Sequence, residues 1–160
     1  MIVPFSATDF LDRALAVYRD RIGVVDEPDQ PARSLGDLTY GELGEKAAAM
    51  AAYLDHIGIG VGERVAFVSH NSARLLTAFF GVSGYGRVLV PVNFRLSAEE
   101  VAYIVKHSGA RVLFVDPEVE EHLASVECEH KFRLGHDDRL FLHGVGPKPW
   151  EPDENATATI

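Results

Sequence analysis

The sequence lacks the features of a disulfide-rich, membrane-spanning or nucleic-acid-binding protein. Its 160 residues include one cysteine, Cys128, which excludes an internal disulfide and is typical of the cytosol. No apolar run approaches the roughly 18 to 20 residues that a membrane span needs, and residues 1–6 show no secretory signal. The net charge of −9 argues against a nucleic-acid partner, because phosphate binding needs clustered Lys and Arg. We therefore expect a cytoplasmic protein without a membrane span.

Residues 1–62 predict a helical N-terminal segment. Hydrophobic and charged residues make up 47% and 24% of the chain, as in an average soluble globular protein of one domain or a large part of one. Apolar residues at helical spacing indicate a helix over residues 8–22, which Gly23 would end, before a short extended piece over residues 24–27. Thr39 and Glu42 then form the pattern of a capping box, which begins a helix that ends at Gly58.

Residues 63–116 show the most regular pattern. Strands are predicted over residues 64–69, 88–92 and 112–115, because these runs are apolar and β-prone. A helix capped by Asn71 lies between the first two strands. A second helix, which begins with the capping-box pattern of Ser97 and Glu100 and ends at Gly109, lies between the last two. The sequence therefore predicts an α/β fold, with a βαβαβ core of parallel strands, right-handed crossovers and flanking helices.

The pattern weakens over residues 117–160. Pro117 is expected to begin a short acidic helix that runs to about residue 126, and residues 131–134 and 139–142 could form strands. Residues 144–155 contain prolines, glycines and acids and indicate a surface connection, after which residues 156–160 become β-prone. The acidic run over residues 116–129 contains no Lys or Arg and is typical of a solvated face.

No motif identifies a catalytic residue. The turn after the first predicted strand lacks the glycines of a dinucleotide-binding loop, and the sequence has neither a Walker-type loop nor a Gly-x-Ser-x-Gly elbow. Cys128 lies in the acidic run, which raises a thiol pKa and disfavours a catalytic thiolate. His122, Cys128 and His130 lack the spacing of a zinc site, so no metal site is predicted.

Two residues are candidates for ligand binding because each follows a predicted parallel strand. His70 follows the first strand and Arg95 follows the second, so both are expected at the carboxyl edge, where open α/β sheets bind ligands. A cation at Arg95 could hold a phosphate or a carboxylate. The alternatives are a histidine with a structural role and an exposed turn arginine.

Four segments in a fixed order resemble part of a known enzyme family. They are Thr39-Tyr-Gly-Glu-Leu43, Gly58-Ile-Gly-Val-Gly-Glu-Arg-Val-Ala66, Gly86-Arg-Val-Leu-Val-Pro-Val-Asn-Phe-Arg-Leu-Ser97 and His107-Ser-Gly-Ala-Arg-Val-Leu-Phe-Val-Asp116. In this order they resemble the N-terminal region of the adenylate-forming acid–CoA ligases, the AMP-dependent synthetase and ligase family, from about Phe5 onward. Asn93-x-Arg95-Leu96 is similar to fatty-acid and related acid–CoA ligases, whereas amino-acid adenylation domains tend to have Asp-Pro nearby.

The resemblance implies a two-step reaction in a longer parent enzyme. With ATP and Mg²⁺, a carboxylic acid, here expected to be a fatty acid, forms an acyl-adenylate and pyrophosphate, and the thiol of coenzyme A then displaces AMP. The family's phosphate loop, adenine and acyl-pocket motifs and catalytic lysine do not occur in residues 1–160, which would be roughly the first third of such an enzyme. The resemblance therefore implies a partial N-terminal domain that is inactive alone. It implies one site residue, Arg95, which is expected to lie near the nucleotide of coenzyme A.

The same resemblance indicates the partners of the chain. We expect the rest of the ligase chain, a small carboxylic acid and self-association through apolar surface that the rest of the ligase would cover. Two alternatives remain open. The chain could be a stand-alone, non-catalytic α/β module that binds another protein through its acidic run. It could also belong to a luciferase-like or peptide-synthetase adenylating enzyme, which shares only the first step.

Overall fold

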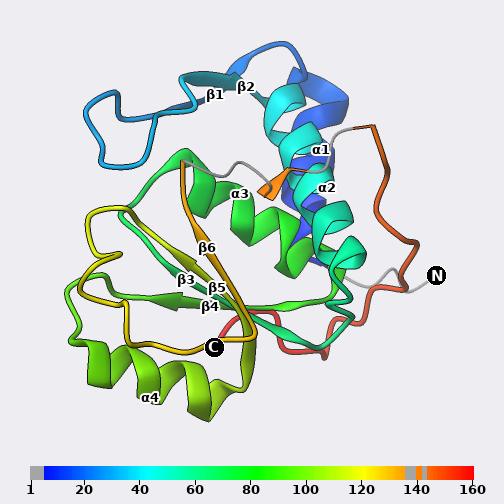
Figure 1. Ribbon diagram of the computed structural model, residues 1–160. Helices are drawn as coiled ribbons and strands as arrows, with labels where there is room; N and C mark the ends of the chain where they lie inside the picture. Colours follow the sequence, from blue (N-terminus) through cyan, green and yellow to red (C-terminus); the bar gives the residue numbers. More distant parts are fainter. Residues whose placement is uncertain (1–5, 136–139, 142–143) are drawn as a thin grey trace.

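Four parallel strands form the centre of the computed structural model, which describes residues 6–135, 140–141 and 144–160 (Figure 1). The strands are β3 (Arg64–Val68), β4 (Val88–Val92), β5 (Ala110–Val115) and β6 (His130–Arg133). Their order in the sheet is β4-β3-β5-β6, and every neighbouring pair is parallel. The predicted α/β fold is confirmed, and β6 extends the predicted three-stranded core by one parallel strand.

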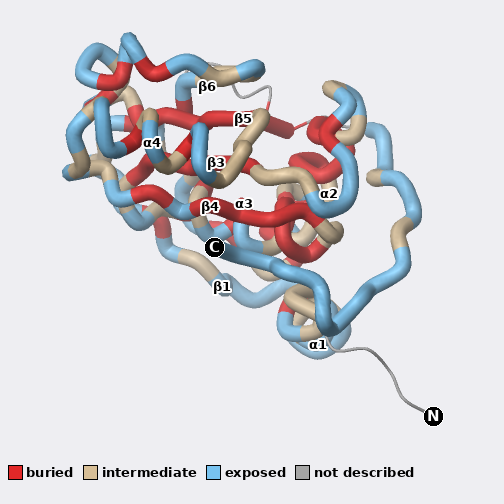
Figure 2. The backbone as a smooth tube through the Cα atoms, turned by 90° about the horizontal axis from the view of Figure 1, so that it is seen from below, coloured by how far each residue is buried: buried red, intermediate tan, exposed pale blue. Residues whose placement is uncertain are grey.

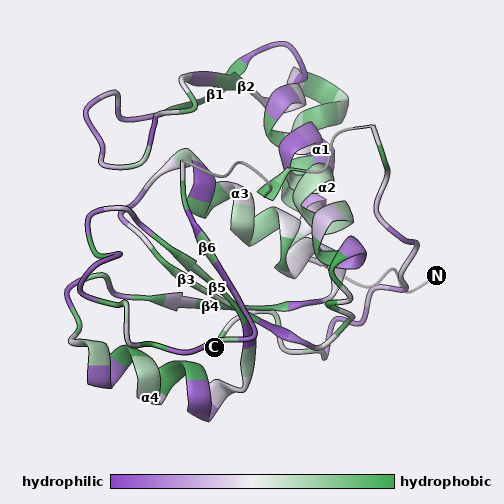
Figure 3. Cartoon of the chain, in the orientation of Figure 1, coloured by the Kyte–Doolittle hydropathy of each residue, from purple (hydrophilic) through white to green (hydrophobic). Residues whose placement is uncertain are grey.

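The central strands are buried on both faces, which explains their continuous apolar runs. Alternate residues of β3, such as Val65 and Phe67, pack with helices α2 (Tyr40–His56) and α3 (Ala73–Gly81). The residues between them belong to a second core cluster with helix α4 (Ala98–Ser108), on the opposite face. Figure 2 shows β3, β4 and β5 as largely buried, and Figure 3 shows β6 as more hydrophilic than β4. Among the described residues, no helix is long and apolar enough to cross a membrane.

The two predicted capping boxes are both present. Thr39 with Glu42, at the start of α2, and Ser97 with Glu100, at the start of α4, each form both hydrogen bonds of the box. Helix α4 is followed by Gly109, whose φ of 65° is left-handed, as expected for a glycine that ends a helix. The sequence pattern therefore predicted the start of both helices and the end of α4.

Helix α3 begins one residue later than predicted. The hydroxyl of Ser72 accepts the N–H of Leu75 at 3.3 Å, so Ser72 is the cap and the prediction of Asn71 is wrong. Ser72 has the extended backbone that a capping residue needs for its side chain to face that N–H. Further along, a Cβ at Gly81 would lie 3.0 Å from Cβ of Met50 in α2, so the two helices pack through a small residue.

The N-terminal segment contains a hairpin that the sequence analysis did not predict. Helix α1 (Thr8–Tyr18) ends before residue 22, because β1 (Ile22–Val25) pairs antiparallel with β2 (Asp37–Thr39). Gly23 therefore lies in a strand and does not end the helix as predicted. A Cβ at Gly23 would lie 2.7 Å from Cε1 of Tyr40, so its absence allows the close approach of that ring. Pairing between strands has overridden the helical spacing of the apolar residues.

Residues 117–125 form a series of turns in place of the predicted acidic helix. The carboxylate of Asp116 accepts the N–H of Glu118 at 3.0 Å, and the Asp116 carbonyl accepts the N–H of Val119 at 3.1 Å, which turns the chain directly after β5. The ammonium group of Lys131 then donates to three carbonyl groups of residues 123–126. In a continuing helix these carbonyls would accept N–H groups from the next turn, whereas here Lys131 binds them, and the Leu123 carbonyl also accepts the N–H of Val126 at 3.0 Å. The strand predicted over residues 139–142 lies mostly outside the described residues.

The predicted acidic run is not only a solvated face. Three of its carboxylates pair with basic groups that lie outside the run in sequence, because β3, β5 and β6 bring these groups next to it. The pairs are Glu118 with His70, Glu120 with Arg133, and Glu129 with Arg111.

The last described residues run beside β4, at the free edge of the sheet (Figure 1). Thr159 and Leu89 form an isolated parallel bridge. The N–H of Leu89 donates to the carbonyl of Ala158 at 2.9 Å, and the N–H of Ile160 donates to the carbonyl of Leu89 at 3.1 Å. Residues 144–157, which precede this bridge, are mostly exposed, as the predicted surface connection requires.

Candidate functional site

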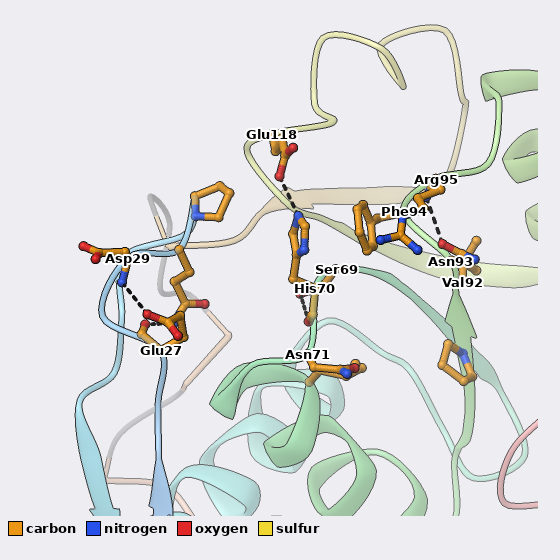
Figure 4. A pocket seen from close by; sticks show the side chains of 14 residues that line it. Glu27, Asp29, Ser69, His70, Asn71, Val92, Asn93, Phe94, Arg95 and Glu118 are labelled. Carbon is orange, nitrogen blue, oxygen red and sulfur yellow. Dashed lines mark hydrogen bonds and ion pairs between the residues drawn. The ribbon is translucent and has the colours of Figure 1, made fainter.

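A cleft with a volume of about 780 Å³ opens at the carboxyl ends of β3 and β4 (Figure 4). Its walls come from the loops after these strands, residues 69–71 and 92–95, from the loop between β1 and β2, and from Glu118 after β5. Parallel strands bring such loops to one edge because their carboxyl ends point the same way. His70 and Arg95, the two candidates from the sequence, both line this cleft.

A carboxylate and an aromatic ring fix the position of His70. Its Nε2 lies 2.5 Å from Oε2 of Glu118, and its ring packs against that of Phe94 with a centroid separation of 3.8 Å and an angle of 35° between the ring planes (Figure 4). The side chains of His70 and Glu118 are 31% and 52% exposed, so solvent reaches both. The imidazole therefore has a defined orientation at an open edge of the sheet. Glu118 was not identified from the sequence as a site residue because it was interpreted as part of the acidic run.

Arg95 also contacts Phe94, which lies between His70 and Arg95 in Figure 4. The guanidinium carbon is 5.1 Å from the centre of the ring, and the backbone N–H of Arg95 donates to Oδ1 of Asn93 at 3.0 Å. Arg95 is exposed, so its guanidinium can pair with a phosphate or a carboxylate in the cleft. Phe94 is a site residue that the sequence analysis did not single out, although it stands directly beside Arg95.

The cleft carries charges of both signs, in different places. Arg95 follows β4, whereas Glu27 and Asp29 belong to the loop between β1 and β2 and Glu118 follows β5. These carboxylates repel an anion and Arg95 attracts one. An anionic ligand would therefore bind on the β4 side of the cleft.

A carboxylate of the protein itself occupies the N-terminus of α3. Asp26 is 6% exposed and accepts hydrogen bonds from the backbone N–H groups of Ala73 and Leu35, both at 2.8 Å, and from the side chains of Gln30 and Ser34. Burial raises the pKa of Asp26, but these hydrogen bonds outweigh burial and hold it below its ordinary value. The helix end where dinucleotide-binding folds hold a phosphate is thus filled by a negative charge. The backbone N–H of Ala73 at this helix end is therefore already paired with Asp26.

The other candidates from the sequence lie outside this cleft. Burial raises the pKa of the Cys128 thiol, which disfavours the thiolate that a nucleophile would need. Within the described part of the chain, His122, Cys128 and His130 do not form a group close enough to share a metal ion.

A protein family accounts for the sheet and for the motifs that surround the cleft. The sequence model of the AMP-binding enzyme family matches residues 11–156. The chain belongs to this family. Among its relatives, the long-chain-fatty-acid–CoA ligase of Thermus thermophilus is 37% identical over 123 residues, and 4-hydroxybutyrate–CoA ligase 2 of Metallosphaera sedula is 34% identical over 125 residues. These alignments cover 77% and 78% of this chain, but only 22% of each relative.

Solved structures of related enzymes contain the same fold. The anthranilate CoA ligase AuaEII, in complex with anthranoyl-AMP, has a TM-score of 0.78 at 25% identity, over 98% of this chain and 30% of that chain. The N-terminal domain of FACL13 from Mycobacterium tuberculosis has a TM-score of 0.77 at 23% identity. The resemblance to the N-terminal region of adenylate-forming acid–CoA ligases is confirmed. The aligned residues make up about a fifth of the length of these sequence relatives, and the structural match covers 30% of the AuaEII chain, so this chain spans only part of such a protein.

Proposed function

We propose that this chain is the N-terminal part of an ATP-dependent, AMP-forming acid–CoA ligase. The observation that carries the proposal is the family match over residues 11–156, supported by relatives named as acid–CoA ligases. In the whole enzyme, a carboxylate oxygen of the acid attacks the α-phosphate of ATP and pyrophosphate leaves. The thiol of coenzyme A then attacks the acyl carbonyl, and AMP leaves. Mg²⁺ that accompanies ATP offsets the phosphate charge.

A fatty acid is the proposed substrate. The Thermus thermophilus relative is named a long-chain-fatty-acid–CoA ligase, and Asn93-x-Arg95-Leu96 is similar to that group. Other relatives are named for 4-hydroxybutyrate, ferulate and 3-hydroxybenzoate. A full-length enzyme that contains this chain should therefore have a higher kcat/KM for palmitate than for 4-hydroxybutyrate or ferulate. The reverse order would refute the assignment of the acid.

The 160 residues alone are proposed to be a scaffold without catalytic activity. Among the described residues that line the cleft, Arg95 brings the positive charge and three carboxylates oppose it, while Asp26 fills the N-terminus of α3. Such a site does not stabilise the charge that develops on a triphosphate under attack. The isolated chain should show no acid-dependent exchange of pyrophosphate into ATP, and robust exchange would contradict this part of the proposal.

Arg95 is proposed to bind a phosphate of coenzyme A. The support is its exposed guanidinium on the β4 side of the cleft, where Phe94 and Asn93 hold the residue. A guanidinium binds phosphate oxygens through paired, charge-assisted hydrogen bonds. Arg95 would then contribute to the second half-reaction and leave the adenylation step unaffected.

A chimeric ligase tests both roles. The chain replaces the matched N-terminal part of the Thermus thermophilus relative, and exchange and thioester formation are measured separately. We expect acid-dependent exchange from the chimera. Arg95→Ala should raise the KM for coenzyme A roughly tenfold to a hundredfold, since a hydrogen bond to a charged group contributes about 1.5–3 kcal/mol. The control is Arg19→Ala, which removes a surface pair with Glu45 and should change neither step. Equal loss of exchange and thioester formation in Arg95→Ala would refute the coenzyme A role.

The rest of the ligase is proposed to cover apolar surface on α3 and β1. Leu76 and Phe79 are each 38% exposed and Val25 is 76% exposed, which leaves large apolar side chains in contact with water. The relatives are several times longer than this chain, so their remaining residues are the proposed cover. The isolated chain should self-associate or bind a hydrophobic dye, and the double variant L76E/F79E should do so less. A wild-type chain that stays monomeric and does not bind the dye would favour the stand-alone module.

A further inference from the structure

The structure brings together three metal-ligating side chains that no motif connects. His70 follows β3, whereas Asp116 and Glu118 follow β5, the next strand in the sheet. One imidazole nitrogen and one oxygen from each carboxylate all lie within 4.8 Å of one another. We propose that His70, Asp116 and Glu118 form a binding site for a divalent transition-metal ion of the zinc type.

The donor atoms suit such an ion. Zinc binds imidazole nitrogen and carboxylate oxygen at about 2.0–2.2 Å, which places neighbouring ligand atoms of a tetrahedral site about 3.3–3.6 Å apart. The three donors lie within the reach of that arrangement, but His70 Nε2 and Glu118 Oε2, at 2.5 Å, are too close. The Glu118 side chain is 52% exposed and can withdraw into the cleft as the ion enters.

Asp116 supplies an independent reason to expect a cation. It is 1% exposed, and its Oδ1 accepts the N–H of Glu118 at 3.0 Å. A ligand oxygen of the second carboxylate, Glu118, lies within 4.8 Å of one of Asp116. Two carboxylates this close together, one of them buried, repel each other unless a positive charge faces them. A metal ion between Asp116, Glu118 and His70 would provide that charge.

The surroundings favour binding at this place. Phe94 packs against the His70 ring and restricts its direction, and Nε2 already faces Glu118. Both His70 and Glu118 line the cleft, which gives an ion from solvent a path to the site and leaves room for water as a further ligand. A site with preoriented ligands and an open coordination position can take up and release its metal ion.

This inference departs from the expectation of no metal site in the sequence analysis. Spacing rules detect ligands that lie near one another in the chain, whereas His70 and Glu118 are 48 residues apart and meet only because β3 and β5 are parallel neighbours. The inference does not depend on the proposed ligase activity. Its test measures metal binding by the chain itself.

Titration of the isolated chain with ZnCl₂, with the heat of binding measured by isothermal titration calorimetry, tests the site. We expect one strongly bound equivalent, and Co²⁺ in its place should give the visible absorption of a low-symmetry nitrogen and oxygen site. Glu118→Gln and His70→Gln should each weaken the strongest binding roughly tenfold or more, by loss of a ligand. Glu118→Gln is the decisive variant, because its half-exposed side chain can change without disturbing the core, whereas Asp116→Asn alters a buried group.

His107→Gln is the matched control, because His107 stacks on the exposed Tyr103 of α4, away from the cleft. This variant should bind zinc as the wild type does. Circular dichroism checks that each variant is folded. Absence of a strong equivalent in the wild type would overturn the proposal. So would unchanged binding in both Glu118→Gln and His70→Gln, which would place the ion elsewhere.

Discussion

Asp26 offers the sharpest test of the loop that borders the cleft. Asp26→Asn removes the negative charge and replaces one acceptor oxygen by an NH₂ group that faces N–H and O–H donors. Hydrogen bonds to a charged group contribute about 1.5–3 kcal/mol, and a charge at a partly buried helix end contributes up to about 2 kcal/mol. The free energy of unfolding should therefore fall by about 2–4 kcal/mol at pH 7. For a chain of this size, Tm should fall by roughly 5–15 °C.

The difference in the free energy of unfolding between the wild type and Asp26→Asn should depend on pH. Four hydrogen bonds hold the pKa of Asp26 below its ordinary value in the folded protein, so the folded state binds the proton less readily than the unfolded state does. A lowered pKa stabilises the fold above the unfolded pKa of about 3.9, and this contribution is lost as the pH falls through the folded pKa. This gap in the free energy of unfolding between the two proteins should be constant above about pH 5 and shrink below about pH 4.

Urea unfolding of both proteins, at pH 7 and at several values down to pH 3, measures this gap. Asp29→Asn is the control, because Asp29 lies in the same loop with its side chain exposed and should change stability by less than about 0.5 kcal/mol. The reasoning is refuted if Asp26→Asn costs no more than Asp29→Asn at pH 7. It is also refuted if the gap widens in acid.

Two pairs of substitutions test other local features by urea unfolding. Ser72→Ala should lower stability by about 1 kcal/mol through loss of the α3 cap, whereas Asn71→Ala should leave it unchanged, and equal effects would place the cap elsewhere. Gly109→Ala and Gly58→Ala both put a side chain on a left-handed backbone, but only the first Cβ meets Arg64, which donates to the Gly109 carbonyl. Gly109→Ala should therefore cost about 1 kcal/mol more, and equal costs would mean that Arg64 moves aside freely.

Local sequence patterns were sufficient to predict the central part of the fold. The run 88–92 is β4 itself, because every residue of this strand except Pro91 is buried and a covered parallel strand favours apolar side chains. The boxes at Thr39 and Ser97 predicted two helix starts, because capping is decided within four residues. The β1–β2 hairpin could not be predicted in this way, since Gly23 is explained only by the ring of Tyr40, a residue distant in sequence.

The candidate site was predictable in part, because the position of a residue directly after a strand is a local feature of the sequence. His70 and Arg95 stand directly after strands, and the rule that parallel strands share a carboxyl edge places both in one cleft. Asp116 and Glu118 also follow a strand, but charge composition alone made them part of a solvated face. Their contact with His70 depends on the order of strands in the sheet, which local patterns do not specify.

The bridge between β4 and the last described residues has a consequence for folding on the ribosome. The hydroxyl of Ser83, just before β4, donates to the carbonyl of Ala158, a contact between residues 75 positions apart. An exposed strand edge can pair with another chain, and contacts of long sequence separation form late because a large loop must first close. While residues 93–157 are being synthesised, the outer edge of β4 is open to such pairing. A variant that lacks residues 158–160 should therefore aggregate more during synthesis than the chain that contains them.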